Sequence, residues 1–388
     1  MNTGRCHAGA AGDDETMTDQ DKCISLNTES ILEKALRGRF LTREEIEHLL
    51  RLKDAEAVAR VFRAARTLRE RYFGSKIFLY GFIYFSTFCR NDCRFCASRI
   101  SNSTAKRYRK TGDEVIEAAC LLAESGIHLI DLTMGEDPLF YDDPAAFDFP
   151  VKLVHGLKTA TGLPVMVSPG MVPRKVLVEF VKAGADWFAC YQETHNRRLF
   201  SRLRPHQDYD ERLSTKAAAK DMGMLIEEGI MIGVGETLSD VSASLYVMHD
   251  LAVHQARVMS FVPQAGTPMS RRLSPPRLRE LLTIAVMRLL FPNRLIPASL
   301  DVDALGHFKE RLDAGANVIT SLIPPHKGLS GVSQPSLGID EGLRTARGVK
   351  SLLEKAELAA ASAEDYRQWM MGQKRGLDEA SRSGEAFP

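Results

Sequence analysis

Three cysteines stand close together in the chain, at a spacing that suits a metal cluster. Cys89, Cys93 and Cys96 form a C-x-x-x-C-x-x-C arrangement within the stretch FCRNDCRFC, in which Phe95 precedes the last cysteine. Thiolates are soft ligands that select zinc or iron–sulfur clusters, and a four-iron cube ordinarily takes four of them. Three ligands leave one iron open, which is a requirement in an enzyme whose cofactor must bind that iron.

This open iron predicts a [4Fe–4S] cluster that acts together with S-adenosylmethionine (SAM). SAM can chelate an iron through its amino and carboxylate groups, and one electron from the cluster then breaks the sulfonium bond and releases a 5′-deoxyadenosyl radical. The protein positions that radical and excludes water. The alternatives are a zinc site completed by a distant His or Cys, or three unrelated thiols. The other cysteines, Cys6, Cys23, Cys120 and Cys190, are expected to be incidental.

Further residues are candidates for holding the cofactor. Glu136 lies in the stretch MGEDP, where it either meets the SAM amino group or, with Asp137, caps the next helix. Glu193 ends a predicted strand and Arg212 begins the following helix. These two either pair with each other or hold the methionyl end of SAM, whose carboxylate suits a planar guanidinium. We favour the cofactor role for Glu193 and Arg212, and we group Phe95 with them.

Four polar residues lie on strands two, six and seven of the predicted fold: Asp131, Arg257, Ser299 and Asp301. Ionised groups inside a barrel are costly unless they are paired or bind a ligand. A free amino acid would match this set, with the guanidinium for its carboxylate, the carboxylates for its ammonium groups and the serine for a neutral hydrogen bond. The alternative is an internal ion-pair network.

The elements that must position these residues alternate between strands and helices. Short apolar, β-branched or aromatic runs predict strands at 77–86, 128–135, 163–170, 187–194, 225–235, 258–264, 295–301 and 317–325. Eight such repeats predict an α/β fold, a (βα)8 TIM-type barrel, with a six-unit partial barrel as the alternative. The cysteines follow the first strand, on the face where active-site loops gather. The stretch GVGE at 233–236 lacks the third glycine of a dinucleotide fingerprint and predicts a tight turn.

The rest of the chain divides around this barrel. Residues 1–28 are polar and without hydrophobic period, which predicts a disordered tail. Residues 29–72 predict an N-terminal helical extension, in which Thr42 followed by Glu44 and Glu45 marks a helix start. We expect the barrel to occupy 73–360, and 361–388 to form the end of a C-terminal helix and a polar tail.

Composition excludes several partners. The 51 basic and 50 acidic residues leave a formal charge of +1, so no broad positive field exists to hold a nucleic acid or an anionic membrane. No apolar run reaches the roughly 18 residues of a membrane span, and the N-terminus lacks the apolar core of a secretory signal. Seven cysteines, three of them crowded, suit metal binding in a reducing compartment. We therefore expect a cytoplasmic enzyme.

Several stretches together resemble the methylornithine synthases of pyrrolysine biosynthesis, a radical SAM group related to biotin synthase and the [FeFe]-hydrogenase maturation enzyme. These stretches are IYFSTFCRNDCRFC, DLTMGEDP, VSPG, YQET, GVGE, RVMSFVPQAGTP, RLIPASLD and AGANVITSLIPP. The resemblance implies a (βα)8 barrel and an isomerase that converts L-lysine to (3R)-3-methyl-D-ornithine. In that reaction the radical takes a hydrogen from the lysine side chain, and the carbon skeleton fragments and recombines as a branched chain.

The resemblance also implies residue roles. Matched positions assign Asp131, Arg257, Ser299 and Asp301 to the amino acid, with Ser168 and Tyr191 lining the site and Glu193 and Arg212 toward SAM. A redox protein such as flavodoxin or ferredoxin is the expected electron donor. One stretch departs: ASRISNSTAKRYRK after Cys96 lacks the aromatic residues of the family pattern. The alternatives are another radical SAM reaction on a small amino acid and a non-catalytic iron–sulfur or zinc module.

Overall fold

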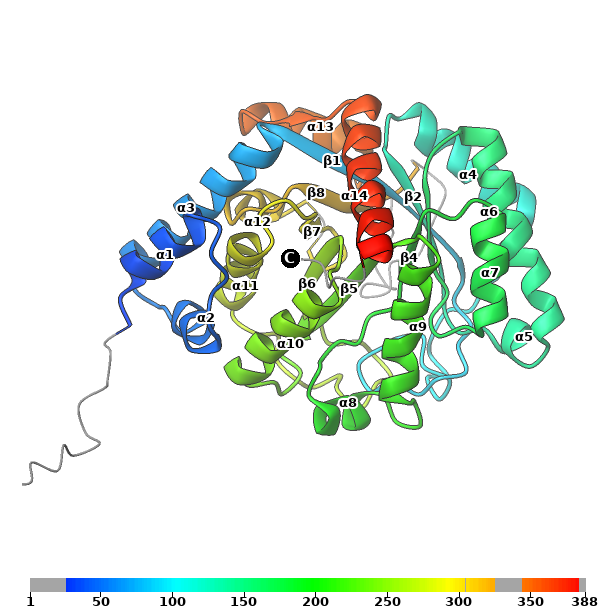
Figure 1. Cartoon of the computed structure of the whole chain (residues 1–388). Coiled ribbons are helices and arrows are strands. Elements are labelled where there is room, and N and C mark those ends of the chain that lie inside the picture. The colour runs from blue at the N-terminus through cyan, green and yellow to red at the C-terminus, as the bar shows by residue number, and fades with distance from the viewer. Residues whose placement is uncertain (1–25, 304, 325–343, 384–388) are drawn as a thin grey trace, which may run out of the picture.

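Eight parallel strands form the centre of the molecule (Figure 1). The structure is a computed structural model and describes residues 26–303, 305–324 and 344–383. Hydrogen-bonded neighbours follow the order β6-β5-β4-β3-β2-β1-β8-β7. A single bridge joins β6 to the residues just before β7, where the amide of Ala256 donates to the carbonyl of Leu295 at 3.0 Å, so the barrel is nearly closed. The eight-stranded prediction is confirmed and the six-unit alternative is wrong. The strands are β1 (Lys76–Ser86), β2 (Leu129–Met134), β3 (Val165–Ser168), β4 (Trp187–Ala189), β5 (Leu225–Ile232), β6 (Gln255–Ser260), β7 (Pro297–Ser299) and β8 (Val318–Leu322).

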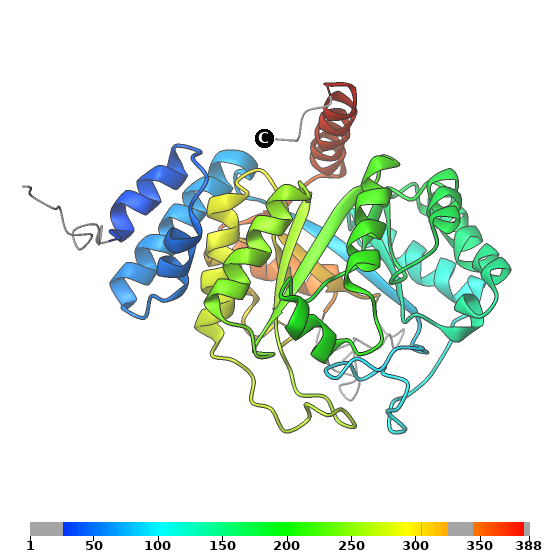
Figure 2. The same cartoon turned by 60° about the horizontal axis from the view of Figure 1, so that its bottom comes forward.

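Helices surround this sheet (Figures 1 and 2). Those after the N-terminal extension are α4 (Gly112–Glu124), α5 (Pro138–Tyr141), α6 (Asp148–Thr161), α7 (Arg174–Lys182), α8 (Arg197–Leu203), α9 (Tyr209–Asp221), α10 (Leu238–Asp250), α11 (Arg277–Leu290), α12 (Phe308–Asp313), α13 (Ala346–Lys355) and α14 (Ala363–Ser383), with a 3-10 turn at Pro144–Phe147. Within the described residues, no helix is long and apolar enough to cross a membrane.

Three helices precede the barrel: α1 (Thr28–Leu36), α2 (Arg43–Leu50) and α3 (Ala55–Phe73). Thr42 and Glu45 form the reciprocal capping box that starts α2, as the sequence predicted. Apolar side chains of α1 to α3, such as Ile31, Leu49 and Val61, are buried in the same core as α11. Of the predicted disordered tail, residues 1–25 lie outside the described part.

Two predicted strands differ most from the structure in their bounds. β6 begins at Gln255 and ends at Ser260, whereas the sequence predicted 258–264. Polar Gln255 and Arg257 hid its start, and Pro263, which has no amide hydrogen for a ladder, stands beyond its end. β4 ends at Ala189, well before residue 194. The chain beyond it regains a single bridge to β5, between Glu193 and Ile230.

The two-residue period of the strands sorts the barrel interior into layers. Leu129, Asp131 and Thr133 alternate along β2, so they lie on one face at increasing height. β1 pairs Tyr80 with Leu129 and Tyr84 with Thr133. Along β2, the apolar Leu129 therefore lies in the layer nearest the start of the strands, and Asp131 and Thr133 lie in the layers nearer the strand ends.

The C-terminal helix α14 covers the end of the barrel at which the strands begin, opposite the active-site loops (at the top of Figure 2). The hydroxyl of Tyr366 lies 2.8 Å from that of Tyr80 on β1. Trp369 stacks on Trp187 of β4, with ring centroids 5.9 Å apart. A short strand before this helix, β9 (Ala359–Ala360), pairs with the beginning of β1. The apolar floor that results leaves the opposite end as the open mouth.

Candidate active site

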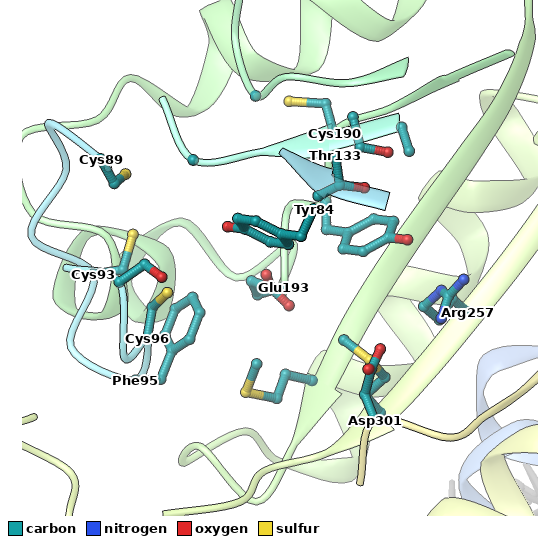
Figure 3. Close-up of a pocket in the computed structure, with 18 of the residues that line it drawn as sticks. Tyr84, Cys89, Cys93, Phe95, Cys96, Thr133, Cys190, Glu193, Arg257 and Asp301 are labelled. Atoms are coloured by element: carbon teal, nitrogen blue, oxygen red, sulfur yellow. The ribbon is translucent and has the colours of Figure 1, made fainter. Parts of the chain in front are cut away.

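One pocket of about 240 Å³ opens at the carboxyl ends of the strands. In Figure 3 the three cysteines of the β1 loop lie at one end, Arg257 and Asp301 at the other, and Tyr84, Thr133 and Glu193 between them. Of the residues that the sequence singled out, those that line this pocket are Cys89, Cys93, Phe95, Cys96, Asp131, Glu136, Ser168, Tyr191, Glu193, Arg212, Arg257 and Asp301. Ser299 does not line it. Cys190, expected to be incidental, does.

The three thiols lie on one loop but do not converge on one point. Among the described residues, no group of three or more Cys, His, Asp or Glu side chains is arranged to hold a single metal ion. A cube of iron and sulfur binds each thiolate at a separate iron, so it suits three spread thiols. Burial raises the pKa of Cys89 to about 11 and that of Cys96 to about 12. These thiols must therefore lose their protons when iron binds.

Two side chains from the segment after α8 reach the middle thiol. Arg204 donates from Nη1 to Cys93 Sγ at 3.5 Å, and Gln207 donates from Nε2 to the same sulfur at 3.1 Å. The Arg204 guanidinium also lies over the ring of Phe95, 5.2 Å from its centroid. Hydrogen bonds to a ligating sulfur are a principal means by which proteins set the reduction potential of an iron–sulfur cluster.

Glu193 combines a strained backbone with an unpaired carboxylate oxygen. Its φ of 67° is in the left-handed region, which is costly for a residue with a side chain and is common at functional sites. Oε1 accepts from Arg204 Nη2 at 2.7 Å, whereas the buried Oε2 has no hydrogen-bond partner among the described residues. Burial raises the pKa of Glu193. The orphaned oxygen fits an ammonium or hydroxyl donor of a cofactor.

Glu136 and Arg212 pair with each other, rather than Arg212 with Glu193. Arg212 Nη1 lies 3.3 Å from Glu136 Oε1, and Arg90 Nε lies 3.1 Å from Glu136 Oε2. The alternative of a bridge between Glu193 and Arg212, which the sequence left open beside the favoured cofactor role, is therefore wrong. The neighbouring Asp137 caps α5 through the amide of Leu139, as the helix-cap interpretation held.

The MGEDP loop is fitted against the cysteine loop. A Cβ on Gly135 would run into the carbonyl oxygen of Phe88, so only glycine permits this close approach. The Gly135 amide donates to the carbonyl of Ser86 at 2.9 Å.

The GVGE stretch at 233–236 forms a second tight turn, in which the amides of Gly233, Val234 and Gly235 all donate to the Glu236 carboxylate. The Glu236 carboxylate therefore occupies the place on these amides where a phosphate or another anion would otherwise bind.

Asp131 has no cationic partner among the described residues. The hydroxyls of Thr133 and Ser168 both donate to its Oδ1, each at 2.8 Å. Burial raises the pKa of Asp131 to about 6, and the nearby Glu227 carboxylate adds to the rise. A buried carboxylate held in this way gains most from a cationic ligand, because an ammonium would stabilise its ionised form.

Arg257 is oriented by a carboxylate that the sequence reasoning missed. Its Nε donates to Glu227 Oε1 at 2.5 Å, and its Nη1 donates to Thr320 Oγ1 at 3.0 Å. The guanidinium lies over Tyr191, 5.6 Å from the ring centroid. Gly229 makes room for that ring, because a Cβ there would lie 2.9 Å from it. Arg257 Nη2 has no described protein partner and can meet a ligand carboxylate.

Asp301 is held from three directions. Ser321 and Ser299 donate to its Oδ2 at 2.5 and 3.3 Å, and Arg344 Nη2 lies 3.0 Å from its Oδ1. Ser321 has a φ of 67°, a second strained residue in the pocket wall. Ser299 thus lies behind Asp301 and contacts it. The internal-pairing alternative holds for Arg257 and Asp301, through partners that the sequence reasoning did not name, but not for Asp131.

Comparison with known proteins agrees with this geometry. A model of the radical SAM superfamily matches residues 83–245. The 3-methylornithine synthase of Methanosarcina barkeri is 40% identical over 338 residues, 87% of this chain and 95% of that protein. The [FeFe] hydrogenase maturase subunit HydE of Thermotoga maritima is 31% identical over 74% of this chain and 82% of its own length. A crystal structure of methylornithine synthase superimposes with a TM-score of 0.83 at 40% identity, covering 87% of this chain and 99% of that one.

A barrel with three spaced thiols at the mouth of its pocket is the architecture of a radical SAM enzyme, and the superfamily match makes that class explicit. The class implies SAM and an iron–sulfur cluster. Within it, the chain belongs to the 3-methylornithine synthase family.

Proposed function

We propose that this protein is a lysine mutase, which converts L-lysine to (3R)-3-methyl-D-ornithine for pyrrolysine biosynthesis. The observation that carries the proposal is the charge at the inner end of the pocket. Among the described residues, three carboxylates, those of Asp131, Glu227 and Asp301, lie in or directly behind this end, against two guanidiniums, those of Arg257 and Arg344. Lysine carries two ammonium groups and one carboxylate, so its net positive charge complements this surplus.

The distribution of those charges also suits lysine. Arg257 presents Nη2 for the substrate carboxylate, since Glu227 and Thr320 occupy its other nitrogens. Asp131 and Asp301 accept the two ammonium groups. A dipolar amino acid with a neutral side chain would leave one carboxylate buried without a cation, which is costly.

The radical chemistry belongs to the opposite end of the pocket. We propose that Cys89, Cys93 and Cys96 hold a [4Fe–4S] cluster and that Glu193, Arg212, Phe95 and the Glu136 loop contact SAM. When bound, these groups supply a 5′-deoxyadenosyl radical through one-electron cleavage of SAM. The chain's own residues do the rest: Arg257, Asp131 and Asp301 hold lysine from both ends, and Tyr191 and Ser168 shape the space between.

Fixing the substrate at several points matters because a fragmenting substrate must recombine in one orientation. The strained backbones of Glu193 and Ser321 set their side chains rigidly into the wall. We propose that the reaction takes place in the cytoplasm and that an acidic flavodoxin or ferredoxin supplies the electron. The barrel proper is proposed to run over 73–360, with 29–72 as a helical extension.

A substrate screen tests the proposal against other radical SAM reactions. The reconstituted enzyme is incubated anaerobically with SAM, a reductant and one amino acid at a time: lysine, ornithine, norleucine or tyrosine. Lysine should stimulate release of 5′-deoxyadenosine or its products far more than norleucine, which has a neutral chain of similar shape. Equal stimulation by norleucine, or stimulation by tyrosine alone, would overturn the assignment.

A further inference from the structure

We propose that the molecular surface around the cysteine end of the pocket is a docking surface for an acidic one-electron donor protein. The inference deepens the proposed function, because it concerns how the cluster of that same site receives its electron. The surface is made by three segments: the cysteine loop (88–110), helix α8, and the segment between β6 and α11 (261–276). Figure 2 shows all three at the end of the molecule opposite α14.

These segments form one continuous surface because they share a small core and several hydrogen bonds. Phe95 of the loop, Leu199 and Leu203 of α8, and Phe261 after β6 pack in one apolar cluster that also includes Cys93. The Arg94 amide donates to the carbonyl of Leu203 at 2.9 Å. Asn102 Nδ2 donates to the carbonyl of Ala265 at 3.0 Å, which ties the loop to the third segment.

The surface is strongly cationic, although the whole chain is almost neutral at a formal +1. Arg94, Lys106, Arg198, Arg202 and Arg271 are exposed on it, and none has an ion-pair partner among the residues that the structure describes. The acidic residues of the same region are already engaged. Asp92 pairs with Arg99 at 2.5 Å, and Asp210, in the first turn of α9, pairs with Arg197 at 2.5 Å.

The same surface exposes the two least buried large apolar side chains of the described residues. Leu273 is 87% exposed and Ile100 is 57% exposed. Each stands on one of the segments that carry the cations. Exposed apolar residues within a charged rim are typical of transient protein interfaces, where charge steers the encounter and apolar contact completes it.

The position of the surface decides what kind of partner it fits. Arg94 directly follows Cys93 and precedes Cys96 by two residues, so a protein docked on its side chain lies close to two of the expected cluster ligands. Lysine and SAM are small and carry positive charge, so an exposed cationic rim gives them no attraction. A protein with an acidic face around its redox centre would be attracted, and its approach would be faster at low salt.

The test compares two reductants on the same cluster, in the absence of lysine. In the full-length reconstituted enzyme, reduction of the cluster is followed by stopped-flow absorbance, either with reduced flavodoxin or with dithionite. The double variant R198E/R202E lies outside the cysteine loop, so the cluster should assemble, which iron content and absorbance confirm. R39E/K53E reverses two exposed cations on the N-terminal extension and serves as the matched control.

R198E/R202E should slow reduction by flavodoxin at low salt by tenfold or more, abolish most of its salt dependence, and leave reduction by dithionite unchanged. R94E should act in the same direction, and the control should match the native protein. An unchanged rate with flavodoxin, or an equal loss with both reductants, would overturn the docking surface. Because lysine is absent, these outcomes are independent of whether lysine is the substrate.

Discussion

The unpaired Asp131 carboxylate makes lysine binding sensitive to pH in a way that can be calculated. Its pKa of about 6 in the free pocket means that most molecules carry the ionised form at pH 7, but only about one in ten do at pH 5. Lysine binds through an ammonium group, which needs the ionised carboxylate. The dissociation constant of lysine should therefore be nearly constant above pH 7 and rise about tenfold from pH 7 to pH 5.

The sign follows from where the proton goes. A bound ammonium stabilises the ionised form and lowers the pKa of Asp131 in the complex, so binding below pH 6 releases a proton and weakens as acid is added. Isothermal titration of lysine into the SAM-bound, unreduced enzyme measures the affinity without turnover. D131N should bind lysine more weakly and without this pH dependence, and it serves as the matched control.

A second variant tests the cause of the shift. The hydroxyl of Ser168 donates to Asp131 and lowers its pKa, in opposition to burial. S168A should therefore move the midpoint of the pH dependence upward while preserving the carboxylate. An affinity that stays constant from pH 8 to pH 5 in the native enzyme, or a midpoint that moves downward in S168A, would refute the reasoning.

Three further changes have outcomes fixed by the structure. R204M and Q207L each remove a hydrogen bond to Cys93 Sγ and should lower the reduction potential of the cluster. A potentiometric titration followed by electron paramagnetic resonance measures this potential, and an unchanged value would contradict the role of these contacts. R344M removes one partner of Asp301 and should raise the KM for lysine at least tenfold with SAM affinity preserved; an equal loss of both affinities would point to general damage. W369A removes the ring that stacks on Trp187 and should lower the free energy of unfolding by about 3 kcal/mol, with lysine affinity intact, as measured by denaturant titration and calorimetry; equal stability would contradict the role of α14 as the barrel floor.

The sequence predicted those features that depend on local pattern. The spacing of Cys89, Cys93 and Cys96 predicted a cluster, and their position after the first predicted strand placed them at the mouth of the barrel, because the strands of such a fold end at the same face. The assignment of Asp131 and Arg257 to barrel strands led to the expectation that both lie inside, and the two-residue period of the observed strands agrees for Asp131. Glu227 could have been found in the same way, since a carboxylate within the apolar stretch LIEEGIMIGVG stands at an inward position.

Other features depend on contacts between distant segments, which leave no local signal. Arg344 meets Asp301 across 43 positions of sequence, and Gln207 meets Cys93 across 114. The sequence also gives no sign that β4 ends early and that Glu193 adopts a left-handed backbone, because the stretch through YQET continues an apolar strand pattern. The pairing of Glu136 with Arg212 likewise becomes visible only when the loops are assembled.

The most direct test of the central claim follows the carbon skeleton of the substrate. Reconstituted enzyme, SAM and a low-potential reductant are incubated with uniformly ¹³C-labelled L-lysine, and the products are resolved by carbon-correlation nuclear magnetic resonance. A lysine mutase yields labelled 3-methylornithine, recognised by a methyl carbon attached to a branched chain, and D131N should yield little of it. Lysine recovered with its straight chain intact, while SAM is cleaved at an undiminished rate, would contradict the account.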